Sequence, residues 1–177
     1  MSTYPTEMDE TLVITAGPTP CRQRSMAVFR RSRLNSITSK VIGAAIEVHR
    51  QMGPGLLESI YQRCLCHELA ERGLAFEAHT TIDVMYKGQL LDGGLKLDLF
   101  VEKLVVVELK AVEELAPIHE AQLLTYLKLT DAPLGLLLNF NVTVLQNGIR
   151  RLLNKRHEVV DDFNPIEKQR LKESGTA

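Results

Sequence analysis

The sequence predicts an α/β domain in which a mixed sheet is flanked by helices. Apolar residues first recur every three to four positions, as on one face of a helix, and then alternate with polar residues in strand-like segments. Two almost wholly apolar runs follow, separated by another helical stretch, which is typical of central strands covered on both faces. The expected order is two helices, three strands, a helix, a strand and a further short strand.

The composition limits the class of protein. A chain of 177 residues with 45% hydrophobic and 24% charged residues is neither collagenous nor wholly disordered nor a disulfide framework. The formal charge of −1 excludes a uniformly basic nucleic-acid binder, although a local basic patch stays compatible with it. No apolar run approaches the roughly 20 residues of a membrane helix. Three cysteines and an acidic N-terminus without a signal-like apolar segment predict reduced thiols in the cytoplasm.

The predicted domain covers residues 35–154, between a flexible tail at 1–34 and a charged C-terminal tail at 155–177. The first tail combines prolines and small polar residues with five arginines: Arg22, Arg24, Arg30, Arg31 and Arg33. We expect these arginines to be solvated, and the alternative is that they touch phosphate. Met26 is an alternative start of the natural chain.

Two helices open the domain. The helical pattern begins at Ser36, continues to Met52 and stops at Gly53-Pro54-Gly55. A second apolar face runs from Leu57 to Leu69, and Gly73 is a suitable residue just past the end of that helix.

Three strands are expected next. Phe76–Val84 alternates with period two, Leu95–Val101 alternates again, and Leu104–Ala111 is almost wholly apolar, as a central strand should be. Turns are predicted at Lys87-Gly88 and at Gly93-Gly94.

The last elements are a helix and its following strands. Pro117 is well placed to begin a helix that runs to about Leu129, with Leu123, Leu124 and Leu127 as its core stripe. Three strand segments are expected after it: Leu134–Phe140, Val142–Leu145 and, beyond a turn at Asn147-Gly148, Ile149–Leu153.

Two charges interrupt the most apolar strand. Glu108 and Lys110 are two residues apart, so their side chains project from the same face of the sheet. Ionised groups in such a strand are costly unless they are paired, hydrated or bound to a metal. One interpretation is therefore a structural ion pair at a strand end.

Asp98 offers a second interpretation, which depends on the turn between the two strands. A two-residue loop would place Asp98 opposite Val107 and leave Glu108 on the other face, whereas a three-residue loop or a bulge would place Asp98 opposite Glu108. In the latter register two carboxylates and an ammonium converge, and oxygen ligands suit Mg²⁺ or Mn²⁺. The glycine-rich segments match no phosphate-cradling loop, which argues against a nucleotide-binding enzyme.

The segment Asp98 to Glu108-Leu109-Lys110 resembles the motif of the PD-(D/E)XK nuclease superfamily, whose restriction-endonuclease-like core is an αβββαβ unit. Leu97 stands where that motif has its proline. Gln122-Leu-Leu-Thr-Tyr126 looks like the QxxxY motif of superfamily members in bacterial recombination exonucleases. Gly55-Leu-Leu-Glu58-Ser-Ile-Tyr61 matches the signature of the bacterial GxxExxY proteins, a branch of this superfamily, and the similarity runs from about residue 37 to 153.

This resemblance implies a metal-dependent nuclease that hydrolyses phosphodiester bonds of DNA, or alternatively RNA. It implies Asp98, Glu108 and Glu58 as ligands of Mg²⁺ or Mn²⁺ and Lys110 as the residue that serves the attacking water. Gln122 and Tyr126 would contact that water or a phosphate. The alternative is a catalytically weak nucleic-acid-binding or protein-interaction module with a nuclease fold, because fold does not fix function. The expected partner is nucleic acid, with DNA preferred, and not a membrane.

Two residues of the GxxExxY segment have simpler interpretations beside the functional one. Tyr61 is equally compatible with a core aromatic whose hydroxyl is satisfied. Gly55 is compatible with a residue that only sets the turn before the helix.

Overall fold

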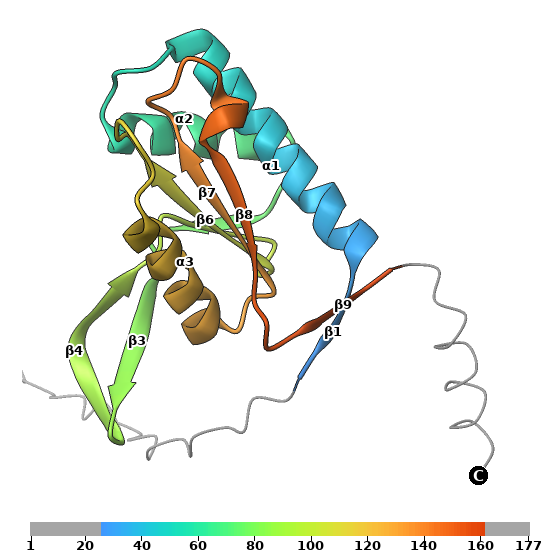
Figure 1. Ribbon diagram of the computed structural model, residues 1–177, viewed down its shortest axis with the longest axis vertical. Coiled ribbons are helices and arrows are strands. Elements are labelled where there is room, and N and C mark those ends of the chain that lie inside the picture. The colour runs from blue at the N-terminus through green and yellow to red at the C-terminus, as the bar shows by residue number, and fades with distance from the viewer. Residues whose placement is uncertain (1–25, 162–177) are drawn as a thin grey trace, which may run out of the picture.

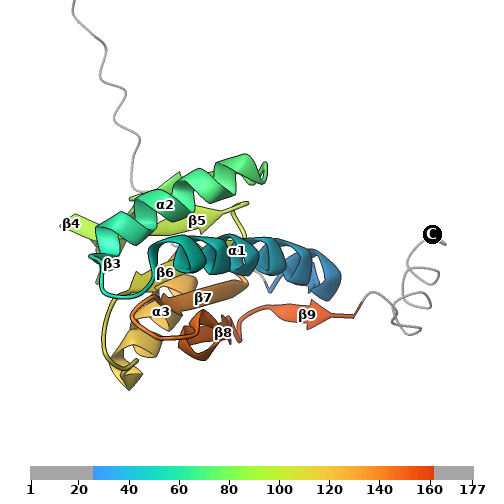
Figure 2. The same cartoon turned by 90° about the horizontal axis from the view of Figure 1, so that it is seen from above.

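A five-stranded mixed sheet forms the centre of the structure, a computed structural model that describes residues 26–161. The strand order is β2-β5-β6-β7-β8. Helices α1 and α2 lie on one face of the sheet and α3 lies on the other, as the two views show (Figures 1 and 2). The predicted fold class, an α/β domain with a mixed sheet flanked by helices and a restriction-endonuclease-like core, is confirmed.

Helices α2 and α3 and the end of α1 lie close to where the sequence signals place them, whereas α1 begins before the predicted start at Ser36. Their bounds are Arg31–Met52 for α1, Glu58–Glu71 for α2 and Pro117–Thr130 for α3. Gly53 ends α1 with a φ of 66°, and its N–H donates to the carbonyl of His49 at 2.9 Å. Gly73 follows α2 with the same φ, a backbone conformation that glycine adopts without a steric penalty.

The strands fall into three sheets. The central sheet holds β2 (Phe76–Ala78), β5 (Leu99–Val101), β6 (Val105–Lys110), β7 (Leu134–Asn139) and β8 (Ile149–Leu153). Strands β3 (Thr81–Tyr86) and β4 (Gln89–Lys96) form a separate antiparallel hairpin, and β1 (Val28–Arg30) pairs with β9 (Glu158–Val160) in parallel. Within the central sheet, β6 and β7 are parallel and the remaining neighbours are antiparallel.

Two strands predicted as continuous are broken. Phe76–Val84 divides into β2 and β3 because His79 takes a positive φ of 55°. Leu95–Val101 divides between β4 and β5 at Leu97-Asp98. The chain therefore leaves the central sheet to build the β3–β4 hairpin and returns to it. The predicted turn at Lys87-Gly88 is present, but Gly93-Gly94 lies inside β4.

Two further expectations for the C-terminal half were wrong. Leu124 was placed in the core stripe of the third helix, yet it is 36% exposed, while Leu123, Tyr126 and Leu127 are buried. Residues 142–145 do not continue the sheet but lead into a short 3-10 helix, η1 (Leu145–Gly148).

The chain ends of the described region also differ from the expected tails. Val28–Arg30 and Glu158–Val160 were assigned to the tails but form the β1–β9 pair, and α1 already begins at Arg31. The rest of the predicted tails, residues 1–25 and 162–177 with Arg22 and Arg24, lies outside the described residues. The boundaries of the domain stay a prediction.

The core lies on both faces of the central sheet. On one face, Val107, Leu109 and Leu136 pack in a cluster with residues of α1 and α2. On the other, Val106 and Leu137 pack with residues of α3. Because side chains alternate along β6, Glu108 and Lys110 share the face of Val106. No helix within residues 26–161 is long and apolar enough to cross a membrane.

Candidate active site

The β5–β6 hairpin places Asp98 opposite Glu108. Val101 pairs with Val105 and Leu99 with Val107, so the connecting loop has three residues, and the next step of the register aligns Asp98 with Glu108. Two of the loop residues, Glu102 and Lys103, have φ values of 53° and 54°. Of the two registers compatible with the sequence, the structure adopts the one that brings both carboxylates to the same side of the sheet.

Asp98 is fixed through its side chain and its backbone. The N–H of Leu109 donates to Asp98 Oδ2 at 2.8 Å. The carbonyl of Asp98 accepts hydrogen bonds from Gln62 Nε2 at 2.8 Å and from the N–H of His79 at 3.2 Å. The break between β4 and β5 is thus held by hydrogen bonds from α2 and from the link between β2 and β3.

Glu108 is the most buried of the acidic residues at this site. It is 3% exposed, and Lys110 Nζ donates to its Oε1 at 2.5 Å. Its second oxygen, Oε2, is buried and has no hydrogen-bond partner among the described residues. An unpaired buried carboxylate oxygen is costly, so this atom marks a place where a cation or a proton would stabilise the site.

The charges of the site act on one another. Burial, with the negative charge of Asp98 added, raises the pKa of Glu108 to about 7, although Lys110 opposes the shift. Burial also raises the pKa of Asp98 and of Glu58, and in both cases Lys110 works in the opposite direction. Burial disfavours the ammonium of Lys110, but the bond to Glu108 and the nearby carboxylates raise its pKa.

Four of the predicted site residues therefore lie within electrostatic reach of each other. Glu58 comes from the first turn of α2, Asp98 from the entrance of β5, and Glu108 and Lys110 from β6. Three carboxyl groups face a single ammonium, which leaves an excess of negative charge. Among residues 26–161 no three His, Cys, Asp or Glu side chains are already arranged to hold a metal ion. The donor set nonetheless fits a hard divalent cation, since it offers only oxygen and includes the unpaired Oε2.

The other two predicted site residues pair with each other. Gln122 Nε2 donates to the hydroxyl of Tyr126 at 2.7 Å, one turn further along α3. Tyr126 is 6% exposed and packs with Leu97 and Val106. Together with Leu95 of β4, Gln122 and Tyr126 line a small pocket of about 290 Å³ between the β3–β4 hairpin and α3. Their hydrogen bonds in the described structure do not involve the carboxylates.

Tyr61 supports the loop in front of Glu58. Its ring is fully buried and stacks on Phe140 with centroids 4.5 Å apart. Its hydroxyl donates to the carbonyl of Gly53 at 2.7 Å and accepts from the N–H of Leu56 at 3.1 Å. The structural interpretation of Tyr61 is thus confirmed, and it ties the start of α2 to the end of α1. Gly55 has a φ of 96°, which explains the glycine in this turn.

Two buried polar residues near the site were missed from the sequence. Gln62 is 5% exposed and holds the backbone of Asp98. Asn139 accepts from the N–H of Val112 at 3.1 Å and donates to its carbonyl at 2.8 Å, which fixes the chain just beyond Lys110. Asn139 interrupts an apolar run, and this position in the sequence could have indicated a buried polar residue with a specific role. Gln62 lies on a helix among other polar residues, so the sequence does not distinguish it from a solvent-exposed side chain.

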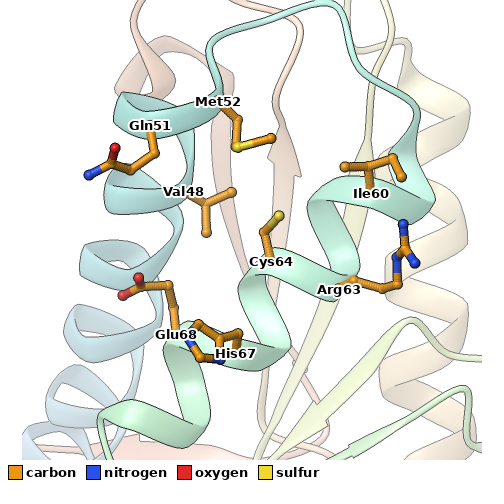
Figure 3. A pocket seen from close by; sticks show the side chains of 8 residues that line it. All are labelled: Val48, Gln51, Met52, Ile60, Arg63, Cys64, His67 and Glu68. Carbon is orange, nitrogen blue, oxygen red and sulfur yellow. The ribbon is translucent and has the colours of Figure 1, made fainter.

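A separate cavity of about 430 Å³ lies between α1 and α2 (Figure 3). Met52 and Val48 enter it from α1, and Cys64 and His67 from α2 (Figure 3). None of the residues that line this cavity belongs to the cluster of Glu58, Asp98, Glu108 and Lys110. The candidate site is therefore defined by its charged groups and not by a deep cavity.

The fold and the site define a class of protein: an α/β domain whose central hairpin opposes an aspartate to a glutamate, with a lysine two residues further on. A family model described as the PD-(D/E)XK nuclease superfamily matches residues 35–152. The chain belongs to this superfamily. No curated protein and no solved structure matches the chain.

Proposed function

We propose that this protein is a metal-dependent nuclease that hydrolyses phosphodiester bonds of DNA and belongs to the GxxExxY branch of the superfamily. The meeting of Asp98, Glu108 and Lys110 across β5 and β6 is the observation that carries the proposal. Membership of a nuclease superfamily supports it. The segment Gly55-Leu-Leu-Glu58-Ser-Ile-Tyr61 supports the branch, because it matches the GxxExxY signature.

Asp98, Glu108 and Glu58 would hold the cation, for which Mg²⁺ or Mn²⁺ is the best match to oxygen-only ligands. When bound, such a cation supplies positive charge that stabilises the phosphate oxygens as negative charge develops on them. It would also offset the burial and the repulsion from Asp98 that raise the pKa of Glu108.

The residues of the chain would position the reaction. Lys110 is held by Glu108 at 2.5 Å, so its ammonium has a fixed place beside the carboxylates, from which it can orient the attacking water and offset charge on phosphate. Gln62 and the N–H of Leu109 hold Asp98 in register. Gln122 and Tyr126 would reach the water or a phosphate from α3, after exchanging their mutual hydrogen bond for one to substrate.

A cleavage assay tests the proposal. Purified protein is incubated with DNA and RNA substrates in Mg²⁺, Mn²⁺ or chelator. Cleavage of DNA should require the metal, and Lys110→Met should reduce the rate on the order of 10²-fold or more, because it removes one positioned charge. The matched control is Lys103→Met, whose side chain is 82% exposed in the β5–β6 loop. Equal cleavage by wild type and Lys110→Met would assign the activity to another site.

One observation favours a second candidate, a nucleic-acid-binding module with little turnover. Lys110 already occupies one oxygen of Glu108, and no three-ligand group is preformed in the described part of the chain. For such a module we expect DNA binding that persists in chelator, no cleavage with any metal, and no gain in melting temperature on adding Mg²⁺ or Mn²⁺.

A further inference from the structure

The fold gathers six exposed cationic side chains at one end of the domain. They come from two stretches far apart in the sequence, residues 30–33 and 151–156, and we call them the basic cluster: Arg30, Arg31, Arg33, Arg151, Lys155 and Arg156. The parallel pairing of β1 with β9 brings the two stretches together. Figure 1 shows β1, β9 and the start of α1 at one end of the domain, and the loop between α1 and α2 at the other.

Contacts of residues in and next to the two stretches show that the stretches lie close to each other. Arg151 Nη2 donates to the side chain of Asn35, in the second turn of α1, at 2.8 Å. Partial burial, together with the positive charge of Arg31, lowers the pKa of Arg151. His157, which follows Arg156, meets the ring of Phe29 edge-on at 5.2 Å.

Little negative charge balances the cluster. Among residues 26–161, Arg31 pairs with Asp161 at 2.5 Å, Glu158 lies in β9, and Asp131 lies 3.3 Å from His157. The remaining five members form no ion pair with any residue between 26 and 161. Helix α1 begins within the cluster without an acidic residue in its first turn, so the positive end of its dipole adds to the same field. In a chain of net charge −1, this is a strong local concentration of positive charge.

The acidic site lies at the opposite end of α1. Tyr61 ties the start of α2, and with it Glu58, to Gly53 at the end of α1. His49, in the last turn of α1, bonds the carbonyl of Val142 at 2.7 Å, beyond the end of β7. The 22 residues of α1 correspond to a length of about 33 Å. At a rise of about 3.4 Å per base pair, the length of α1 equals about 10 base pairs of duplex. Arg30, Arg31 and Arg33 lie at the start of this length, whereas Arg151 lies nearer to the site, because it pairs with Leu136 and Leu136 pairs with Val107.

We propose that the basic cluster binds the phosphate backbone of duplex DNA at a distance from the cleavage site, so that the protein engages both ends of a segment of about one helical turn. The inference rests on the proposed function for the nature of the substrate. Duplex is favoured over single-stranded DNA because single-strand binders add exposed aromatic rings for base stacking. The aromatic residue within the cluster, Phe29, is instead half-buried against His157.

Binding is measured first, in chelator, so that cleavage does not enter. Affinity for a 20-base-pair duplex is followed by fluorescence anisotropy across a salt titration, with wild type and the triple variant Arg30→Gln, Arg33→Gln, Arg156→Gln. These side chains are exposed and form no ion pair among the described residues, so the fold should survive. The slope of log K against log salt should fall by about 3, because each phosphate contact contributes about 0.9. The matched control, Arg63→Gln, Lys87→Gln, Lys103→Gln, removes the same charge elsewhere and should lower the slope by less than about 1.

Cleavage then tests the distance. With Mg²⁺, the triple variant should lose roughly tenfold in kcat/KM on the 20-base-pair duplex, since it lacks the remote phosphate contacts. On a 6-base-pair duplex closed by a hairpin loop, which cannot reach both places, wild type and variant should cleave alike. Equal loss on both lengths would place the arginines at the cleavage site itself and overturn the remote contact.

The two proposals fail separately. An unchanged salt slope in a protein that cleaves DNA would overturn the basic cluster as a binding surface and leave the nuclease intact. A reduced slope in a protein that never cleaves would overturn the nuclease and leave the binding surface. An equal effect of the triple variant on a 20-nucleotide single strand, or binding of the cluster to anionic vesicles in preference to duplex, would also overturn the inference.

Discussion

Two antiparallel hairpins follow one another in this chain, and they share almost nothing but their topology. β3–β4 forms a two-stranded sheet of its own, which projects from the body in Figure 1, whereas β5–β6 lies in the central sheet. Residues 105–109 of β6 are all buried, while most of β4 is exposed. The comparison teaches that a charged residue acquires chemical consequences from its surroundings: Glu108 has a pKa of about 7 because packing holds it away from water.

The difference arises from neighbours. β6 pairs with β5 on one edge and with β7 on the other, and helices cover both its faces. At the far end of β3–β4, four large apolar side chains are exposed: Met85, Tyr86, Leu90 and Leu91. The central hairpin therefore has both a tight core and a fixed geometry for its charges. The projecting hairpin packs at its base, where Ile82 and Leu95 contact the core, and its far end is free of both constraints.

The largest expected effect comes from removing a core side chain beside the central hairpin. Leu136 in β7 pairs with Val107 and is fully buried, so Leu136→Ala should lower the free energy of unfolding by about 2–5 kcal/mol. Leu90→Ala removes the same atoms from a residue that is 57% exposed and should cost less than about 1 kcal/mol. Urea denaturation measures both, and similar losses would mean that the projecting hairpin is packed in solution.

A smaller effect is expected from adding a single methyl group to the same strand. A Cβ at Gly135 would lie 2.8 Å from two carbons of the Leu123 side chain, which is itself fully buried between α3 and the sheet. Gly135→Ala should therefore lower the free energy of unfolding by about 1–3 kcal/mol through overpacking. An unchanged melting temperature would show that α3 can move away from the sheet.

The central hairpin should give the free energy of unfolding a characteristic dependence on pH. The folded protein raises the pKa of Glu108 from its ordinary value of 4.5 to about 7, so between these values the folded state binds more protons than the unfolded state. In chelator, the free energy of unfolding should then fall as the pH rises from about 4.5 to about 7, by up to about 3 kcal/mol, since one pKa unit corresponds to about 1.4 kcal/mol.

Glu108→Gln should reduce this slope without abolishing it, because burial raises the pKa of Asp98 and Glu58 in the same direction. Denaturant titrations at several pH values supply the measurement. A free energy of unfolding of the wild type that rises with pH over this window would contradict an excess of carboxylates with raised pKa values at the site.

The smallest effect is expected at the end of the projecting hairpin. Leu90→Ser exchanges an exposed apolar side chain for a polar one and should change the free energy of unfolding by less than about 0.5 kcal/mol. Cleavage of DNA should stay within twofold of wild type under the proposed function. A loss of activity with unchanged stability would assign this hairpin a direct contact with substrate.

The sequence predicts the central elements of the fold better than the connections between them. Strong periodicity in α1 and the apolar runs around Val106 and Leu136 predict elements that packing then enforces. The break at His79 could not be predicted, because a histidine in the left-handed region interrupts an alternating pattern that continues on both sides. Leu124 was misplaced since α3 is apolar over much of its surface, so spacing alone does not select the buried stripe.

In the candidate site, too, the sequence predicts the residues within one strand better than those whose position depends on a connection. The spacing of Glu108 and Lys110 fixes their common face, but the position of Asp98 depended on a loop whose length the sequence left open. Its three-residue form places Glu102 and Lys103 in the left-handed region, a conformation that neither residue type signals. The basic cluster was also beyond prediction, because it depends on a strand pair between residues about 130 positions apart.

The β1–β9 pair can form only late in synthesis of the chain. The ribosome releases β1 and the first turn of α1 early, but β9, their partner, emerges only after every other strand of the domain. Closing a loop of this length costs only slightly more chain entropy than closing a shorter one, since the cost grows with the logarithm of length. The pairing of β1 with β9 is therefore a late step in folding with a small additional entropy cost. A nascent chain that stalls before residue 158 keeps the β5–β6 hairpin, while β1 and the arginine that follows it lack their partner strand.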